Sequence, residues 1–170
     1  MTAQSLFEPI SVLVVDDSAY MRQLLLGLLN ALEVGKTFLG ANGEEGLDLY
    51  RRHRPDVVIT DAAMEPGDGF DLVKRLRAID CTEMSTAPII MVSGHTDVAS
   101  VEKARDAGIT AFLSKPISAA TLYRRLAEVV CYPRAFIETD TYPGPDRRRR
   151  DTPFEGVDRR QAAAPQVTLL

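Results

Sequence analysis

The fold of this chain of 170 residues can be approached from the stretch ISVLVVDDS, residues 10–18. Its apolar run ends in two adjacent carboxylates, Asp16 and Asp17. Near-continuous apolar strands are typical of a parallel sheet that is buried on both faces and binds ligands at the carboxyl ends of its strands. The sequence therefore predicts a strand over residues 10–15 and places Asp16 and Asp17 at the edge of a binding site.

Other apolar stretches also run into polar residues. These are residues 56–60 before Asp61, 88–92 before Ser93, and 110–113 shortly before Lys115. Because the carboxyl ends of parallel strands meet at one edge of a sheet, we expect these side chains to gather there. Three carboxylates, a hydroxyl and an ammonium group suit a hard divalent cation and a phosphoryl group.

Helical patterns alternate with these strands. Ser18 can cap a helix whose leucines recur at helical spacing, Asn42 can begin a second helix, and Ser118 can cap a last one. Two more helices are expected around Leu72 and Val101, and a weak strand over residues 36–39. Such alternation predicts an α/β fold with a five-stranded, parallel, doubly wound, flavodoxin-like sheet and helices on both faces. The natural strand order is 2-1-3-4-5.

Composition divides the chain at residues 132 and 133. The body, residues 10–132, follows a short extension over residues 1–9. The last 38 residues hold five of the ten prolines and few apolar residues, so residues 133–170 are expected to be a tail without its own core, disordered when free. Residues 1–132 carry a net charge of −5, which argues against a general affinity for nucleic acid, whereas the tail carries +1.

Targeting and membrane signals are not expected in this sequence. No apolar run approaches the roughly 18 residues of a membrane span. The first ten residues do not read as a secretory signal. Cys81 and Cys131 lack the spacing of a metal or redox motif, which favours reduced thiols. These features predict a cytoplasmic protein.

Four stretches together resemble the receiver domain of two-component response regulators, of the single-domain, CheY-like kind. They read LVVDDSAYMRQLL, DVVITDAAMEPGDGFDLVKRLR, PIIMVSG and AFLSKP, and they span residues 13–116 in the family's order. The spacings also agree, with 44 residues from Asp17 to Asp61, 32 to Ser93 and 22 to Lys115. The resemblance implies a signalling module that is not an enzyme in the usual sense, although it catalyses its own phosphorylation.

The resemblance implies a role for each matching residue. Asp61 would be the phosphoacceptor. Mg²⁺ would be bound by Asp16, Asp17, Asp61 and the backbone carbonyl of Ala63. Phosphoryl binding and switching would fall to Ser93, Lys115 and Phe112. The Lys115–Pro116 peptide bond would be cis, and a histidine kinase or phosphotransfer protein would be the donor.

The chain departs from the family pattern at several positions around this site. Phe112 stands where tyrosine is commoner, Ala62 and Ala63 leave the Asp61 loop bare, Glu65 replaces a usual proline, and His95 follows Ser93 by two residues. None of these changes removes the phosphorylation chemistry. They leave open how strongly phosphorylation drives the output.

The tail contains a repeated unit. Residues 142–148, YPGPDRR, and residues 154–160, FEGVDRR, both read aromatic-x-Gly-x-Asp-Arg-Arg, twelve residues apart. Arginine offers planar donors to phosphate or guanine, aromatic rings stack on bases, and aspartate accepts from guanine N–H groups. The combination fits a guanine nucleotide better than a bare polyanion.

A receiver followed by such a tail is similar to the Cle group of CheY-like cyclic di-GMP effectors. The resemblance implies that cyclic di-GMP orders the tail, and that the protein then docks to the flagellar motor switch to control motility or surface attachment, with recruitment to the flagellar pole. The implied ligand contacts are Arg134, Tyr142, Asp146, Arg147, Arg148, Arg149, Arg150 and Asp151. A second set is Phe136, Phe154, Asp158, Arg159 and Arg160.

Two other functions stay open at this point. The chain could be a conventional phosphorelay receiver with an inert tail, or a regulator that binds nucleic acid. The interleaved acids of the tail favour the nucleotide over the nucleic acid, because a tail that simply binds phosphate backbones has little use for Asp146, Asp151 and Asp158.

Overall fold

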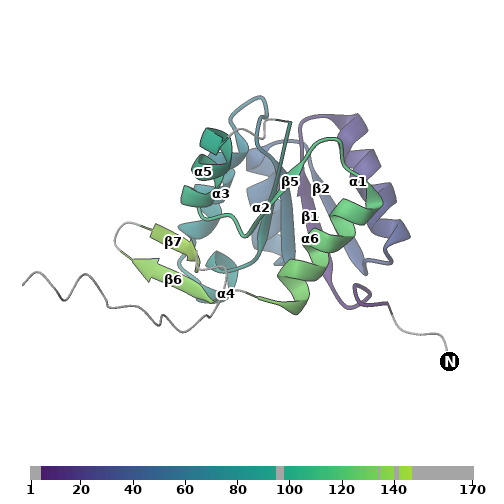
Figure 1. The fold of residues 1–170 in the computed structure, drawn as a ribbon. Coiled ribbons are helices and arrows are strands. Elements are labelled where there is room, and N and C mark those ends of the chain that lie inside the picture. The colour runs from purple at the N-terminus through teal and green to yellow at the C-terminus, as the bar shows by residue number, and fades with distance from the viewer. Residues whose placement is uncertain (1–4, 95–97, 134, 140–141, 147–170) are drawn as a thin grey trace, which may run out of the picture.

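The computed structural model describes residues 5–94, 98–133, 135–139 and 142–146. Its main sheet has five parallel strands in the order β2-β1-β3-β4-β5 (Figure 1). They are β1 Ser11–Val15, β2 Lys36–Gly40, β3 Val57–Asp61, β4 Ile89–Ser93 and β5 Ala111–Ser114. The predicted α/β fold and strand order are therefore confirmed, with strand ends displaced by about one residue.

Helices cover both faces of this sheet (Figure 1). They are α1 Ala19–Ala31, α2 Gly43–His53, α3 Gly69–Arg77, α4 Thr82–Ser85, α5 Val98–Asp106 and α6 Ala119–Cys131. Side chains cap four of them by accepting a backbone N–H, and the capping residues are Ser18, Asn42, Asp68 and Ser118. The short helix α4 was not expected from the sequence.

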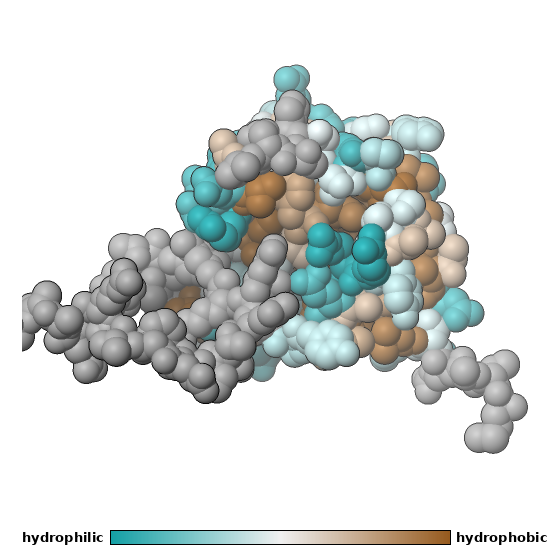
Figure 2. Space-filling model, in the orientation of Figure 1, coloured by the Kyte–Doolittle hydropathy of each residue, from teal (hydrophilic) through white to brown (hydrophobic). Residues whose placement is uncertain are grey.

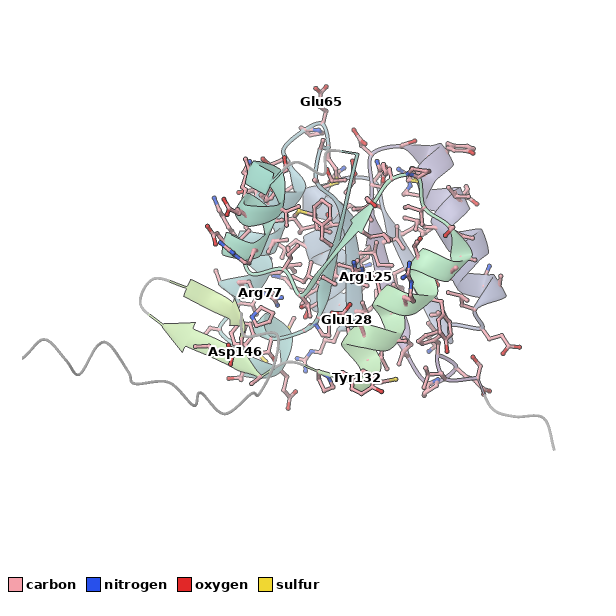
Figure 3. All side chains as sticks on the ribbon, in the orientation of Figure 1. Glu65, Arg77, Arg125, Glu128, Tyr132 and Asp146 are labelled. Atoms are coloured by element: carbon pink, nitrogen blue, oxygen red, sulfur yellow. The ribbon has the colours of Figure 1, made fainter. Side chains whose placement is uncertain are left out.

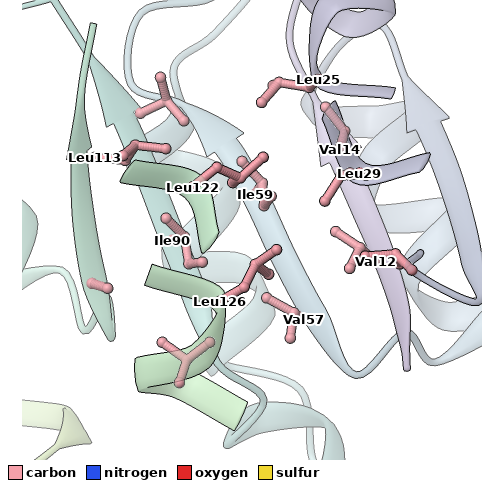
Figure 4. Packing of buried hydrophobic residues seen from close by; sticks show 14 of the residues in the cluster. Val12, Val14, Leu25, Leu29, Val57, Ile59, Ile90, Leu113, Leu122 and Leu126 are labelled. Carbon is pink, nitrogen blue, oxygen red and sulfur yellow. The ribbon is translucent and has the colours of Figure 1, made fainter. Parts of the chain in front are cut away.

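The core consists of two apolar layers, one on each face of the sheet. Val12 and Val14 point to one face, and Leu13 and Val15 point to the other, as side chains alternate along a strand. The first layer lies against α1 and α6, where Leu122 and Leu126 are fully buried (Figure 4). The second lies against α2, α3 and α5. Burial of both faces explains why the strands read as continuous apolar runs.

The described part of the N-terminal extension is attached to this core. Phe7 is buried, its ring meets Tyr123 of α6 edge to face at 5.4 Å, and its carbonyl accepts the N–H of Gly35. The Lys115–Pro116 peptide bond is cis, as expected, and so is Glu65–Pro66.

Two strands follow the last helix. Strand β6, Phe136–Thr139, pairs antiparallel with β7, Tyr142–Pro145. The expectation that residues 133–170 are disordered when free is therefore wrong for residues 136–139 and 142–145. The ring of Phe136 lies against Arg77 of the body, so this hairpin does not depend on a core of its own. No helix in the described part of the chain is long and apolar enough to span a membrane.

Candidate functional site

Three carboxylates meet at the carboxyl ends of β1 and β3. Asp16 and Asp17 directly follow β1, and Asp61 is the last residue of β3. The two strands are neighbours in the sheet, and one carboxylate oxygen from each residue lies within 4.8 Å of the other two. Asp16 and Asp61 are buried, whereas Asp17 is exposed. The sequence prediction that these acids converge is borne out by the geometry.

Backbone groups hold two of these acids in place. The N–H of Ser18 donates to Oδ1 of Asp16 at 2.8 Å, and the N–H of Glu65 donates to Oδ2 of Asp17 at 3.0 Å. Arg22, on the first turn of α1, donates to the carbonyl of Asp16 at 2.7 Å. Arg22 was not predicted from the sequence to belong to the site, although its position one helical turn after the Ser18 cap places it beside the end of β1.

Lysine and serine complete the cluster from β4 and β5. Nζ of Lys115 lies 3.0 Å from Oδ1 of Asp61. Ser93 is buried at the end of β4, and its carbonyl accepts the N–H of Lys115 at 2.9 Å. Adjacent parallel strands thus bring the predicted hydroxyl and ammonium residues to the edge that carries the acids.

A tight backbone contact shapes the loop after Asp61. A Cβ atom on Gly69 would lie 2.0 Å from the carbonyl oxygen of Asp61, so this position accepts only glycine without a shift of the strand end. The N–H of Gly69 donates to the carbonyl of Ala62, and Ala63 forms a bridge with Asp68. Gly69 was not singled out from the sequence, because its pressure on Asp61 depends on how the loop folds back.

The negative charges of the three carboxylates are only partly compensated by neighbouring groups. Burial raises the pKa of the Asp16 carboxyl, the N–H of Ser18 lowers it, and the nearby Asp61 raises it further. Oδ2 of Asp16 is buried and has no hydrogen-bond partner. Three carboxylates share one ammonium group, so a hard cation with oxygen ligands would remove both the repulsion and the unpaired oxygen. The residues therefore fit Mg²⁺.

A hollow lies beside β5, on the face shown in Figures 2 and 3. It has a volume of about 710 Å³ and lies between α5 and α6, with Val101, Phe112 and Tyr123 among its lining residues. Figure 2 shows hydrophobic residues in this region next to hydrophilic ones of α6. Arg125 and Glu128 form an ion pair there at 2.8 Å, and Tyr132 lies at the far end of the helix (Figure 3). Phe112 is half-buried against the second core layer.

The predicted nucleotide-binding residues lie mostly outside the described part of the chain. Phe136 stands in β6 and Tyr142 in β7, and the N–H of Asp146 donates to the carbonyl of Ala135 at 2.7 Å. The remaining candidates lie outside the described residues, as does His95. They are Arg134, Arg147, Arg148, Arg149, Arg150, Asp151, Phe154, Asp158, Arg159 and Arg160.

The fold and the site define a doubly wound α/β protein with three carboxylates clustered at the carboxyl ends of its strands, an arrangement that suits a hard cation. The sequence profile of the response regulator receiver domain matches residues 12–127. The chain therefore belongs to the response regulator receiver family. Receiver domains typically bind Mg²⁺ in the acidic pocket that Asp16, Asp17 and Asp61 form in this chain.

Individual relatives agree with this assignment. The chemotaxis protein CheY-3 of Vibrio cholerae is 30% identical over 118 residues, which cover 69% of this chain and 89% of that protein. The polar-differentiation response regulator DivK of Brucella anthropi is 34% identical over 110 residues, 65% of this chain and 87% of DivK. The crystallised response regulator CheY4 of Vibrio cholerae is 31% identical, with a TM-score of 0.66 over 71% of this chain and 98% of that one.

Proposed function

We propose that this protein is a signalling adaptor whose receiver domain accepts a phosphoryl group on Asp61. The observation that carries the proposal is the pairing of the buried Asp61 with Lys115 at 3.0 Å, next to two further acids. A carboxylate oxygen of Asp61 would attack phosphorus, forming an O–P bond while the bond between phosphorus and the donor breaks. Lys115 and Ser93 would then bind the phosphoryl oxygens, which they can reach from neighbouring strands.

The acids of β1 would hold the cation that this transfer needs. Asp16, Asp17 and Asp61 supply carboxylate oxygens, and the carbonyl of Ala63 follows Asp61 by two residues. When bound, Mg²⁺ supplies positive charge that offsets the charge on the transferring phosphoryl group. The protein orients these ligands through the backbone N–H groups of Ser18 and Glu65. A histidine kinase or phosphotransfer protein is the donor that this chemistry suits.

Acetyl phosphate with Mg²⁺ tests the proposed phosphorylation. The wild-type chain should gain the mass of one phosphoryl group, and Asp61→Asn should not, because an amide is not a nucleophile of this kind. Asp48→Asn is the matched control, since Asp48 is an exposed acid on α2. Its labelling should equal that of the wild type. Labelling of Asp61→Asn to the wild-type level would refute the assignment of Asp61.

The finer function that we propose is binding of cyclic di-GMP through the arginine-rich tail. The support is the repeated aromatic-x-Gly-x-Asp-Arg-Arg unit at residues 142–148 and 154–160, with extra arginines at 149 and 150. Guanidinium groups and rings suit the phosphates and guanines of this ligand. Ordering a tail on a ligand costs a few kcal/mol, so several charge-assisted contacts are needed.

The partner that we propose is a flagellar motor switch protein. The support is the relatives named for chemotaxis and the hollow between α5 and α6, whose rim carries the exposed side chains of Val101 and Tyr123. Phe112 lines this hollow from β5, the strand that leads to Lys115. Its ring position would report the phosphorylation state to this face. Cytoplasmic localisation with recruitment to the flagellar pole remains a prediction from the sequence.

Calorimetric titration of the full chain with cyclic di-GMP tests the finer function. Binding should release heat, and Arg147→Ala or Arg148→Ala should cost more affinity than Arg159→Ala, because the first repeat holds more arginines and Asp151. Equal losses in both repeats would contradict this ranking. Absence of heat would favour an inert tail. Tight binding of duplex DNA with a steep salt dependence, without competition by the dinucleotide, would favour a nucleic-acid regulator.

A further inference from the structure

Arg77 is a buried cation that lies far from the acidic site. It is the last residue of α3 and is only 6% exposed. Its Nε and Nη2 both donate to the carbonyl of Gly108, at 3.0 and 2.9 Å. Its Nη1 donates to the carbonyls of Ser85 and Ala87, both at 2.7 Å. These bonds tie the end of α3 to the loops that enter β4 and β5.

The same guanidinium group meets the ring of Phe136. Its central carbon lies 5.4 Å from the ring centroid, within the range of a cation–π contact. Hydrogen bonds occupy the edges of the planar group, which leaves a flat face available for an aromatic ring. Arg77 is therefore positioned to hold strand β6 against the body of the domain.

The open end of the hairpin makes this contact. Phe136 pairs with Pro145, which is buried, and the N–H of Asp146 donates to the carbonyl of Ala135 at 2.7 Å. A cavity of about 310 Å³ separates the two parts. Thr86, Pro88, Thr110 and Val129 line it from the body, and Phe136 and Pro145 line it from the hairpin. The contact between Phe136 and Arg77 thus holds the hairpin to the body, and the bond between Asp146 and Ala135 closes the hairpin at its open end.

We propose that the surface around Arg77 is a docking seat for the chain's own β6–β7 hairpin, and that this docking positions the arginine run for its ligand. The inference rests on the proposed cyclic di-GMP function for its ligand part. Arg147 follows Asp146 directly, so the run begins one residue after the closed end of a hairpin that Phe136 attaches to the body. Phe136, which the sequence assigned to ligand contact, becomes the anchor of the hairpin.

The seat and the acidic site lie at opposite ends of the sheet. Thr86, Pro88 and Thr110 precede β4 and β5, whereas Asp61 and Lys115 follow the strands. Figure 3 shows this separation, with Glu65 of the Asp61 loop at the top and Arg77 and Asp146 at the lower left. The hairpin end at Asp146, from which the chain continues into the arginine run, therefore lies remote from the acidic site.

A pair of hairpin variants of the full chain tests the docking. Phe136→Ser removes the ring from Arg77, and Ile137→Ser is the control, because neighbouring residues of a strand face opposite sides. Neither residue belongs to the two core layers, so both variants should fold. Arg77 is a poorer choice, since its hydrogen bonds also hold the loops before β4 and β5.

The first measurement needs no ligand. NMR spectra of Phe136→Ser should show shifted amide signals at Ser85, Ala87 and Gly108, and faster hydrogen exchange of the Asp146 amide. Spectra of Ile137→Ser should retain the wild-type values at these four amides. Unchanged signals in Phe136→Ser, or equal changes in both variants, would overturn the docking seat whatever the tail binds.

The second measurement is the affinity of each variant for cyclic di-GMP by calorimetry. If the docked fraction falls to about a tenth, Phe136→Ser should bind about tenfold more weakly, while Ile137→Ser stays within about twofold of the wild type. Unchanged or tighter binding by Phe136→Ser would overturn the positioning role. The NMR differences between the two variants could be as expected while the wild-type chain does not bind the dinucleotide. That result would refute the ligand and its positioning, but the docking of the hairpin at Arg77 would still hold.

Discussion

Asp16 is the residue at which the acidic site is most strained electrostatically. It is 1% exposed, its Oδ2 has no partner, and Asp17 and Asp61 lie beside it. Buried like charges destabilise a fold unless a counter-charge compensates them. The closely spaced carboxylates therefore lower the stability of the fold, but a cation site needs several oxygen ligands close together.

Replacement of Asp16 by asparagine should therefore stabilise the metal-free protein. The amide keeps an acceptor for the N–H of Ser18 and removes one buried charge, so the free energy of unfolding at neutral pH should rise by about 1 kcal/mol or more. Mg²⁺ should stabilise the wild type by about 2.7 kcal/mol at a hundred times its Kd, and Asp16→Asn by clearly less. Urea unfolding with and without Mg²⁺ measures both effects. Lower stability of Asp16→Asn without metal would contradict the proposed strain.

Tyr50 is a second buried polar group, and it lies remote from the acids. Its hydroxyl donates to the carbonyl of Met84 at 2.5 Å, and burial raises its pKa from 10.0 to about 12. The folded state retains the hydroxyl proton of Tyr50 to a higher pH than the unfolded state does. The contribution of Tyr50 to the free energy of unfolding is therefore fully present below pH 10 and is lost as the pH rises toward about 12.

Tyr50→Phe should remove that alkaline dependence and the hydrogen bond. The free energy of unfolding at pH 7 should fall by about 1 kcal/mol, since the carbonyl of Met84 loses its donor. Between pH 10 and 12 the gap between the two proteins should narrow. Urea unfolding at several pH values checks both statements, and a constant gap across this range would show that Tyr50 titrates alike in both states.

At the scale of elements, α3 and the loop before it fix the direction of Asp61. Gly69 begins α3 and lies directly against the carbonyl of Asp61. The loop between them is short and closed by the Ala63–Asp68 bridge, so a shift at one end must reach the other. The acid is thus positioned by backbone packing as well as by its ion pair with Lys115.

Gly69→Ala should therefore damage both stability and phosphorylation. The added methyl group overlaps the strand end, so the free energy of unfolding should fall by about 1–3 kcal/mol and labelling by acetyl phosphate should slow. Gly27→Ala is the control. Gly27 lies in the interior of α1 with open space around it, and its alanine variant should be more stable by roughly 0.5–1 kcal/mol. Wild-type labelling rates in a folded Gly69→Ala protein would contradict the positioning role.

At the scale of the whole molecule, the sequence alone predicted those strands and helices whose own residues form a recognisable pattern. Residues 10–15 and 88–92 read as buried strands because both of their faces are covered, and Ser118 marks a helix start through a cap that the structure contains. Helix α4 has four residues, too few for a periodic pattern. The convergence of Asp16, Asp17 and Asp61 followed from strand order, which is a property of the fold class.

The features that the sequence could not predict depend on contacts between distant segments. Strand β7 carries Pro143 and Pro145, which argue against a strand, and Phe136 of β6 contacts Arg77, which lies 59 residues earlier in the chain. Arg22 and Gly69 act on backbone atoms of the strand ends, so their importance is visible only when the loops are in place. A buried arginine at the end of α3 gave no sign of a partner in the tail.

The layout of the molecule predicts that the body works without the tail. Both core layers are formed by residues before Cys131, and the acidic site lies at the opposite end of the sheet from the hairpin. A chain that ends at Pro133 should lose no more than about 2 kcal/mol of unfolding free energy, which corresponds to the contact between Phe136 and the buried Arg77. Its labelling by acetyl phosphate and its stabilisation by Mg²⁺ should match those of the full chain, and its binding of cyclic di-GMP should be absent in calorimetry.

Full-chain Asp61→Asn is the complementary control, because it should bind the dinucleotide without being phosphorylated. Loss of phosphorylation on truncation would show that the hairpin supports the acidic site, and retained dinucleotide binding would place that ligand on the body.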